Sequence, residues 1–417
     1  MTSSEVHRAI EAIWRIESPK LIATVARLVR DVGRAEDLAQ DAFVAALAQW
    51  PEQGIPRNPG AWLMTAAKRR AIDAIRRDVA FERKAEALGR DAEASEPDDP
   101  FASALGEIDD DLLRLMFVAA HPVLSPEARV ALVLRLLGGL TTPEIARAFL
   151  IPEATVAQRI VRAKRTIADA GVPFEVPSGP ERAERVASVL GAIYLIFNEG
   201  YAATAGDDVL RPELVEDALR LGRVLARLMP DEPEVHGLVA LMELQASRMK
   251  ARVGPDGQPI LLLDQDRGKW DHLLIGRGLA ALMRAEALSQ ASGPYALQAA
   301  IAACHARAGT PEQTDWPRIA SFYDALARIV PTPVVALNRA VALGMASGPQ
   351  AGLDVVDGLR DEPSLHSYHL LPSVRADLLS KLGRMDEARA EFERAAALAG
   401  NSRDRTLLLQ RASRCRA

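Results

Sequence analysis

The sequence has little cysteine: the 417 residues include only Cys304 and Cys415, which lie far apart along the chain. A disulfide framework or a cysteine-based metal cluster requires several cysteines at short spacings, so the sequence predicts neither. We expect both thiols to be reduced. Cys304 is expected to be a small, buried apolar residue.

Long hydrophobic runs are also absent. No segment approaches the roughly 20 consecutive apolar residues that a membrane-spanning helix needs, and the first residues do not resemble a secretory signal. We therefore expect a cytoplasmic protein without a membrane partner. The length exceeds what one hydrophobic core usually fills, which predicts two or three domains.

Signs of catalysis are scarce. The chain has no glycine-rich phosphate loop and no nucleophile elbow. Its seven histidines are scattered, and only His366 and His369 are close, without a cysteine or paired acid beside them. The sequence therefore predicts no enzyme, no catalytic residue, no metal site and no cofactor.

One polar group leaves an enzyme or cation site open as an alternative. Counting twelve residues from Asp264 reaches Ile275, where a calcium-binding loop would need a bidentate glutamate. The simpler interpretation is that these residues end one helix and cap the next. The group comprises Asn198, Glu199, Asp264, Asp266 and Asp271.

Nearly every apolar pattern has helical spacing, and no alternating β-branched run with hairpin turns is evident, so an all-α fold is predicted. Proline, glycine and acidic residues mark linkers at 90–104 and 171–180. We expect five parts. They are an N-terminal domain at 1–89, an acidic linker at 90–111, a second domain at 112–170, a linker at 171–180 and a C-terminal helical domain at 181–417.

The charge is distributed in opposed segments, although the net charge is only −5. Residues 60–77 contain five bases and one acid, and residues 120–170 contain seven bases and four acids. Between them, residues 91–111 contain nine acids and no base. This alternation suggests two DNA-contacting modules joined by a tether.

Residues 140–167 have the pattern of a helix-turn-helix. Thr142 is expected to cap the first helix, and Pro152 to close the turn, where many such motifs have a glycine and this chain has Leu150. The second helix begins near Glu153. Its inward residues are Val156, Ile160, Ala163 and Ile167, and its outward residues, suited to phosphates and base edges, are Thr155, Gln158, Arg159, Arg162 and Arg165. An ordinary helical hairpin with a solvated basic face would give the same pattern.

The N-terminal block predicts two amphipathic helices. The first, at 34–50, has an apolar side opposite an acidic rim of Glu36, Asp37 and Asp41. The second, at 61–77, follows a loop rich in proline and glycine and exposes bases near Trp62. An aromatic residue beside a basic helix and a polar loop could capture single-stranded DNA, and the alternative is that both helices are purely structural.

The C-terminal block contains weak repetition. The spacing of Ala376, Leu379, Gly383, Ala388, Phe392 and Ala395 is similar to that of a tetratricopeptide repeat, a pair of antiparallel helices. Ala303 and Ala340 precede Ala376 by comparable steps. Small residues at these positions would let paired helices approach closely.

The order of these parts resembles a bacterial RNA polymerase sigma factor of the extracytoplasmic-function (ECF) class. The resemblance rests on four segments in this order: AEDLAQDAF, PGAWLMTAAKRRAIDAIRR, the acidic linker and the helix-turn-helix. The resemblance implies core RNA polymerase and promoter DNA as partners, with contacts to the β′ clamp helices and the β flap. It implies clamp-helix binding by Asp37, Gln40, Asp41 and Phe43. It implies −10 recognition by Arg57, Asn58, Trp62, Lys68, Arg69, Arg76 and Arg77, and −35 recognition by the five outward residues named above.

The segments AIYLIFNEGYA and LLLDQDRGKWD are similar to those of ECF factors with a long, TPR-like helical extension. The resemblance implies that the extension regulates activity, with a signalling protein as a further partner. Two other functions remain open. A helical-repeat adaptor would bind a peptide and not initiate transcription, and an enzyme would lose turnover on changing Asp264 or Glu199.

Overall fold

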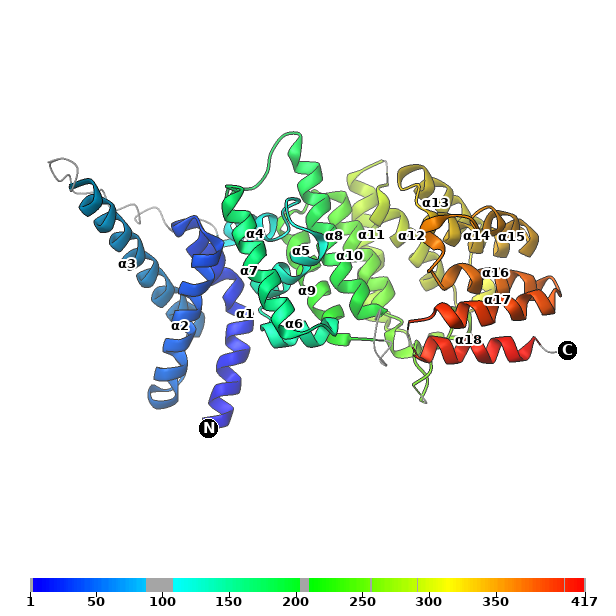
Figure 1. The fold of residues 1–417 in the computed structure, drawn as a ribbon, viewed down its shortest axis with the longest axis horizontal. Helices are drawn as coiled ribbons and strands as arrows, with labels where there is room; N and C mark the ends of the chain where they lie inside the picture. The colour runs from blue at the N-terminus through cyan, green and yellow to red at the C-terminus, as the bar shows by residue number, and fades with distance from the viewer. Residues whose placement is uncertain are drawn as a thin grey trace. The chain divides into compact units, whose positions relative to one another are not determined.

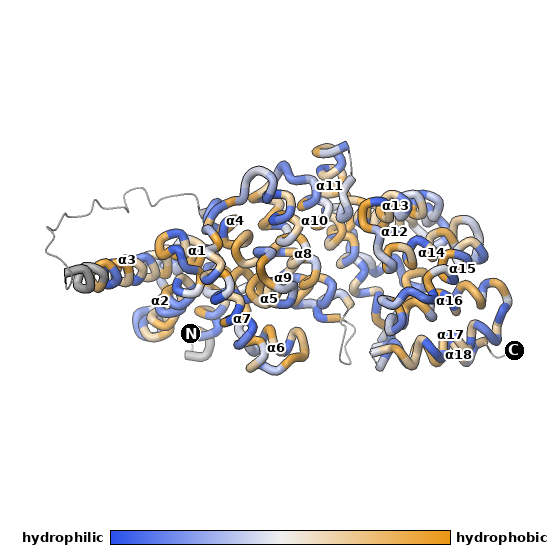
Figure 2. The backbone as a smooth tube through the Cα atoms, turned by 45° about the horizontal axis from the view of Figure 1, so that its top comes forward, coloured by the Kyte–Doolittle hydropathy of each residue, from blue (hydrophilic) through white to orange (hydrophobic). Residues whose placement is uncertain are grey.

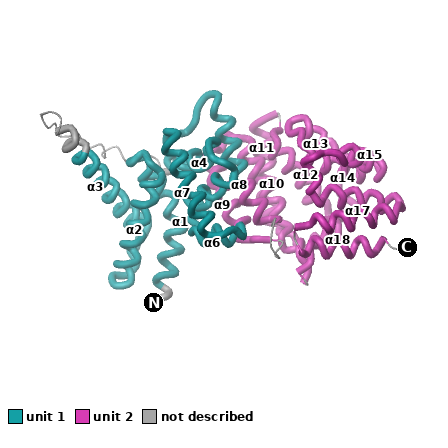
Figure 3. The backbone as a smooth tube through the Cα atoms, viewed as in Figure 1, with its two compact units in different colours: residues 1–193 teal, residues 194–417 magenta. Residues whose placement is uncertain are grey.

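The computed structural model describes residues 3–87, 108–202, 210–255, 257–290, 292–400 and 402–415. Within these ranges all regular secondary structure is helical, apart from one isolated β-bridge between Val253 and Pro259. The all-α prediction is confirmed. The chain divides into two compact units, residues 1–193 and 194–417 (Figure 3). No helix in the described ranges is both long enough and apolar enough to cross a membrane.

Unit 1 begins with three helices that pack on one another: α1 (Ser3–Val29), α2 (Val32–Gln53) and α3 (Pro59–Ala87) (Figure 1). The Asp31 side chain caps α2 by accepting a hydrogen bond from the Arg34 backbone N–H at 2.8 Å. A cap of this kind satisfies an N–H that the first helical turn leaves unpaired. Residues 90–107 of the predicted acidic linker, which spans 90–111, lie outside the described residues.

The second part of unit 1 contains α4 (Ile108–Ala119), α5 (Pro126–Val133), the π-helix η1 (Leu134–Gly138), α6 (Thr142–Phe149) and α7 (Glu153–Asp169). Helix α4 packs on α1, and α7 packs on both α5 and α2. The last four residues of the segment expected to be linker, 108–111, therefore form the first turn of α4.

Helix α8 (Glu181–Tyr201) contains the division between the units. Its first half packs on unit 1, where the Ser188 hydroxyl donates to the carbonyl of Ala120 and Arg185 donates to that of Phe117. The packing boundary at 193/194 thus falls after the predicted linker at 171–180. The reason is that the α8 residues following that linker satisfy carbonyls at the end of α4.

Unit 2 consists of successive helices in which each packs on the next (Figures 1 and 3). Figure 2 shows their alternating hydrophobic and hydrophilic stretches, as expected of amphipathic helices. They are α9 (Pro212–Leu228), α10 (Pro233–Ala246), α11 (His272–Leu288), α12 (Pro294–Arg307), α13 (Trp316–Ile329), α14 (Pro333–Ser347), α15 (Pro349–Asp357), α16 (Leu370–Lys381), α17 (Met385–Leu398) and α18 (Ser402–Arg414).

The predicted repeat at 376–395 forms a pair of packed helices, α16 and α17. Its residues Ala376, Leu379, Ala388 and Phe392 are buried in one hydrophobic cluster. Close approach depends on small residues elsewhere too: a Cβ added to Gly352 would lie 2.6 Å from the Ala340 carbonyl oxygen. Membership of the tetratricopeptide class stays a prediction.

The polar segment that suggested a cation site is a capping loop. Asp271 caps α11 by accepting hydrogen bonds from the N–H groups of Leu273 and Leu274 at 3.0 and 3.1 Å. Asp266 accepts one from the Gly268 N–H. These two carboxylates thus accept hydrogen bonds from the backbone. Within the described ranges, no cluster of His, Cys, Asp and Glu side chains is arranged to hold a metal ion. Cys304 is buried and free, as predicted.

His305, on α12, is buried with its ring edge-on to Trp316 at a centroid distance of 5.2 Å. Desolvation, together with the charges of Arg248 and Arg267, lowers its pKa to about 4. A buried imidazole with this pKa stays neutral in the fold, whereas the unfolded chain takes up a proton below its ordinary pKa of about 6.5.

His305 should therefore make unit 2 less stable as the pH falls. Between pH 7 and 5 the unfolded state binds the proton and the folded state does not, which costs about 2 kcal/mol. Urea unfolding of the full chain should show this loss, and His305→Gln should abolish that part of it. The exposed His366→Gln serves as the control and should keep the wild-type dependence. Identical pH dependence in all three proteins would contradict the prediction.

Candidate nucleic-acid and polymerase interface

The helix-turn-helix begins with a capping box. The Thr141 hydroxyl accepts from the Glu144 N–H, and the Glu144 carboxylate accepts from the Thr141 N–H at 2.7 Å. The cap is therefore Thr141, and the expectation of Thr142 was wrong by one residue, because the reciprocal bond to Glu144 selects the threonine three positions before it. Burial alone would raise the pKa of Glu144, but the hydrogen bonds from Thr141 lead to a lowered pKa.

The turn is closed by Leu150, which adopts the left-handed conformation with φ 51° and ψ 40°. This conformation favours glycine, since a Cβ crowds the following carbonyl. The N–H groups of Leu150 and Ile151 donate to α6 carbonyls, and Pro152 then precedes α7. Leu150 thus holds the position for which related motifs use glycine, with its side chain 54% exposed.

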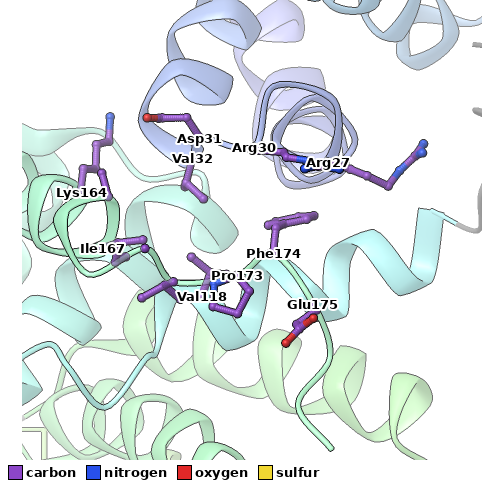
Figure 4. Close-up of a pocket in the computed structure, with 13 residues that line it drawn as sticks. Arg27, Arg30, Asp31, Val32, Val118, Lys164, Ile167, Pro173, Phe174 and Glu175 are labelled. Carbon is purple, nitrogen blue, oxygen red and sulfur yellow. The ribbon is translucent and has the colours of Figure 1, made fainter. Parts of the chain in front are cut away.

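Helix α7 has the two predicted faces. Val156, Ile160, Ala163 and Ile167 are buried, as the spacing indicated. The five residues proposed for −35 recognition lie outside this apolar stripe: Thr155, Gln158, Arg162 and Arg165 are exposed, and Arg159 is partly buried. One cation of the helix, Lys164, faces differently, because it lies beside the start of α2 (Figure 4).

The residues proposed for −10 recognition occupy the α2–α3 loop and α3. Asn58 caps α3, accepting from the Ala61 N–H at 3.0 Å. The Trp62 ring packs edge-on against buried Trp50, with centroids 5.3 Å apart, and keeps part of its surface exposed. The cations of this set are spread along the loop and the helix. Arg57, Arg69, Arg76 and Arg77 are exposed, and Lys68 is partly buried.

The proposed polymerase-binding residues lie on two sides of α2. Asp37 and Asp41 are exposed, whereas Gln40 and Phe43 are partly buried. The Phe43 ring lies 4.7 Å from that of Trp14 on α1. Gln40 donates a hydrogen bond to the Glu36 carboxylate at 2.7 Å.

Glu36 does not belong to the exposed acidic rim that the sequence predicted, because it is 2% exposed. Its carboxylate accepts from the Arg135 guanidinium at 2.6 Å and pairs with the Lys164 ammonium at 2.5 Å. A buried carboxylate requires such partners. The available sequence signal was its helical spacing from Val32 and Gln40, which puts it on the inward side of α2.

Two clefts flank these contacts. One, of about 700 Å³, is lined by Trp14 of α1, by Gln40 and Phe43 of α2, and by Leu140 and Thr141 from the turn before α6. The other, of about 610 Å³, lies between the ends of α1 and α7 (Figure 4). Both clefts are formed jointly by the two parts of unit 1.

Three segments of the chain match known families. Residues 13–80 match the Sigma-70 region 2 family and residues 114–167 match the Sigma-70 region 4 family. Residues 185–286 match DUF6596, a family of unknown function. The first two segments correspond to α1–α3 and to α4–α7.

Similar proteins agree with these matches. The chain is 44% identical to an uncharacterized protein, R00370, of Rhizobium meliloti over 389 residues, which cover 92% of this chain and 90% of that protein. It is 28% identical to the probable ECF RNA polymerase sigma factor SigI of Mycobacterium tuberculosis over 42% of this chain and 60% of that protein. The identity to the ECF sigma factor SigK of a Mycobacterium species is also 28%, over 36% and 77%. These similarities support an ECF sigma factor.

Leu150→Gly should stabilise unit 1 by about 0.5–1 kcal/mol, because glycine adopts the left-handed conformation without the Cβ penalty. The matched change Ala157→Gly, at an exposed helical position of α7, should destabilise it by about 1 kcal/mol. Urea unfolding of the full chain measures both. A loss of stability in Leu150→Gly as large as that in Ala157→Gly would show that the turn is not strained.

Proposed function

The chain belongs to the same family as R00370 of Rhizobium meliloti, and we propose that it binds core RNA polymerase and directs promoter-specific initiation as an ECF sigma factor. The observation that carries this proposal is the pairing of a region 2 segment with a region 4 segment whose second helix has an outward basic face. The mechanism is recruitment without covalent chemistry.

Region 4 positions the complex at the −35 element. Helix α7 enters the major groove in the usual manner of a recognition helix. Thr155, Gln158 and Arg159, in its first half, face base edges, and Arg162 and Arg165 neutralise phosphates. Support comes from the exposure of this face and from the burial of the opposite one.

Region 2 opens and holds the −10 element. The exposed Arg57 lies beside the start of α3, and the exposed cations along α3 can follow a phosphate backbone. Trp62 provides an aromatic edge for an unpaired base. The residues assigned to this role are Arg57, Asn58, Trp62, Lys68, Arg69, Arg76 and Arg77.

Polymerase binding falls to α2 and to region 4. Asp37, Gln40, Asp41 and Phe43 contact the β′ clamp helices, and region 4 contacts the β flap. The exposed carboxylates of Asp37 and Asp41 suit a basic partner surface. Unit 2, a TPR-like array of packed helices, regulates this activity through a signalling protein.

Two arginines of α7, Arg159 and Arg162, should have different effects on transcription in vitro by the full chain with core polymerase. Arg159→Ala should reduce discrimination between promoters by about 1–3 kcal/mol, as loss of a base contact does. Arg162→Ala should weaken DNA binding on all promoters and make the salt dependence shallower by about one phosphate.

The control is Arg360→Ala, which removes an exposed arginine from unit 2 and should leave both properties unchanged. Equal activity of the two α7 variants on every promoter would contradict these roles. Absence of transcripts and of polymerase binding with the wild-type chain would instead favour the helical-repeat adaptor.

A further inference from the structure

Two sequence segments that the proposed function does not use come together in unit 2. The segment AIYLIFNEGYA contains Tyr201, the last residue of α8, and the segment LLLDQDRGKWD leads into α11. The end of α10 and the residues after it connect the two. The Asp271 N–H donates to the Ser247 carbonyl, and the Arg252 guanidinium donates to the Tyr201 carbonyl.

Three arginines and two aromatic rings alternate where these segments meet. The guanidinium carbons of Arg252 and Arg248 lie 3.7 and 6.0 Å from the centroid of the Tyr201 ring. Those of Arg248 and Arg267 lie 5.8 and 5.0 Å from the Trp270 ring. We call these five residues the arginine–aromatic cluster. It lies within residues 185–286, the segment that matches a family of unknown function.

The two outer arginines of the cluster have structural partners. Arg252 donates to the carbonyl at the end of α8. Arg267 donates to the carbonyls of His305 and Ala308 at the end of α12, both at 2.6 Å. The last carbonyls of a helix lack intrahelical donors and carry partial negative charge, so cations at these two positions stabilise the helix ends.

The central cation, Arg248, has no such partner. Among the described residues, no hydrogen-bond acceptor and no carboxylate contacts its half-buried side chain. Its distances to the two rings are close to the limit of about 6 Å for cation–π attraction, so the rings compensate its charge little. The indole N–H of Trp270, which is 4% exposed, likewise has no acceptor in the described part of the chain.

The charge of Arg248 is also unfavourable for its neighbours. Burial lowers the pKa of both outer arginines and of His305, and the charge of Arg248 lowers each of these pKa values further. Asp404 and Glu312 act on the outer arginines in the opposite direction, but neither forms an ion pair with the cluster as far as the chain is described. A cation retained among like charges is expected where an external anion binds.

We propose that the arginine–aromatic cluster binds a multiply charged oxyanion, with Arg248 as the residue that contacts it. A guanidinium has five N–H donors in a planar fork and binds two oxygens of a phosphate or carboxylate at once. The outer arginines add positive potential while they keep their carbonyl partners. The ligand is a phosphate ester or a polycarboxylate, since the two share this chemistry. The inference concerns unit 2 alone and does not depend on sigma activity.

Titration of the full chain without polymerase tests the site. Pyrophosphate represents phosphate esters and citrate represents polycarboxylates, each added at constant ionic strength against chloride. Tryptophan fluorescence follows binding, because Trp270 lies beside Arg248. At least one probe should give a saturable change that is half complete below about 1 mM, as charge-assisted hydrogen bonds to a small ion allow. A response to pyrophosphate alone would indicate a phosphate ester, and a response to citrate alone a polycarboxylate.

Variants of the central arginine assign the response to the cluster. Arg248→Met removes the charge but keeps a long side chain, and should weaken binding at least tenfold. Arg248→Lys keeps the charge but loses the planar fork of donors, and should bind with intermediate affinity. The matched control Arg360→Met removes an exposed arginine elsewhere in unit 2 and should bind as the wild type does.

Stability separates a binding role of Arg248 from a structural one. In chloride alone, Arg248→Met should unfold at a urea concentration no lower than the wild type, because the central charge repels its neighbours. A clear loss of stability would overturn the proposal. So would the absence of a saturable response to both probes, or an undiminished response in Arg248→Met. A chain that binds an oxyanion but neither binds polymerase nor initiates would instead overturn only the proposed function.

Discussion

The arrangement of unit 1 depends on one buried carboxylate. Glu36 lies on the inward side of α2, where an unpaired charge would be strongly unfavourable. Arg135 and Lys164 supply the compensating charges from the part of the chain that contains η1 and α7. Removing one partner from such a buried ion pair strongly destabilises the fold, because it leaves an uncompensated charge. Replacing the whole pair by apolar residues often changes the stability little. The ion pairs of Glu36 therefore contribute more to specifying which surfaces pack together than to the free energy of folding.

Helix α7 serves two surfaces at once. Its apolar stripe holds it against α5, its exposed arginines are solvated, and Lys164 reaches back to α2. Three directions on one helix are compatible because residues at a spacing of 3.6 per turn separate into distinct stripes. The helix that is proposed to read DNA thus also contacts region 2, alongside the packing of α4 and η1 on α1.

Unit 2 follows a different principle. Its helices pack mainly on their neighbours in sequence, and glycines and alanines set the separation between them. Such an array needs no long-range ion pair to specify its order, since each pair of helices buries the face of the next. His305 is buried in this array, and desolvation is the leading cause of its lowered pKa.

The sequence by itself determined the all-helical fold, the buried stripe of α7 and the paired helices at 376–395, because helical periodicity is a local property that each segment carries. It placed Leu150 where the common pattern has glycine and predicted that Pro152 closes the turn, whereas Leu150 itself adopts the left-handed conformation. Local spacing misplaced the cap by one residue, since the reciprocal bond between Thr141 and Glu144 decided it.

Only the tertiary structure decided the environment of Glu36. Its helical spacing from Val32 could place Glu36 on the inward side of α2, but nothing nearby in the sequence indicates that Arg135 and Lys164 will neutralise it. Ion pairs between distant segments depend on which surfaces meet in three dimensions. The free energy of burying a charge depends on which groups surround it in the folded protein. The periodicity of one helix does not contain that information.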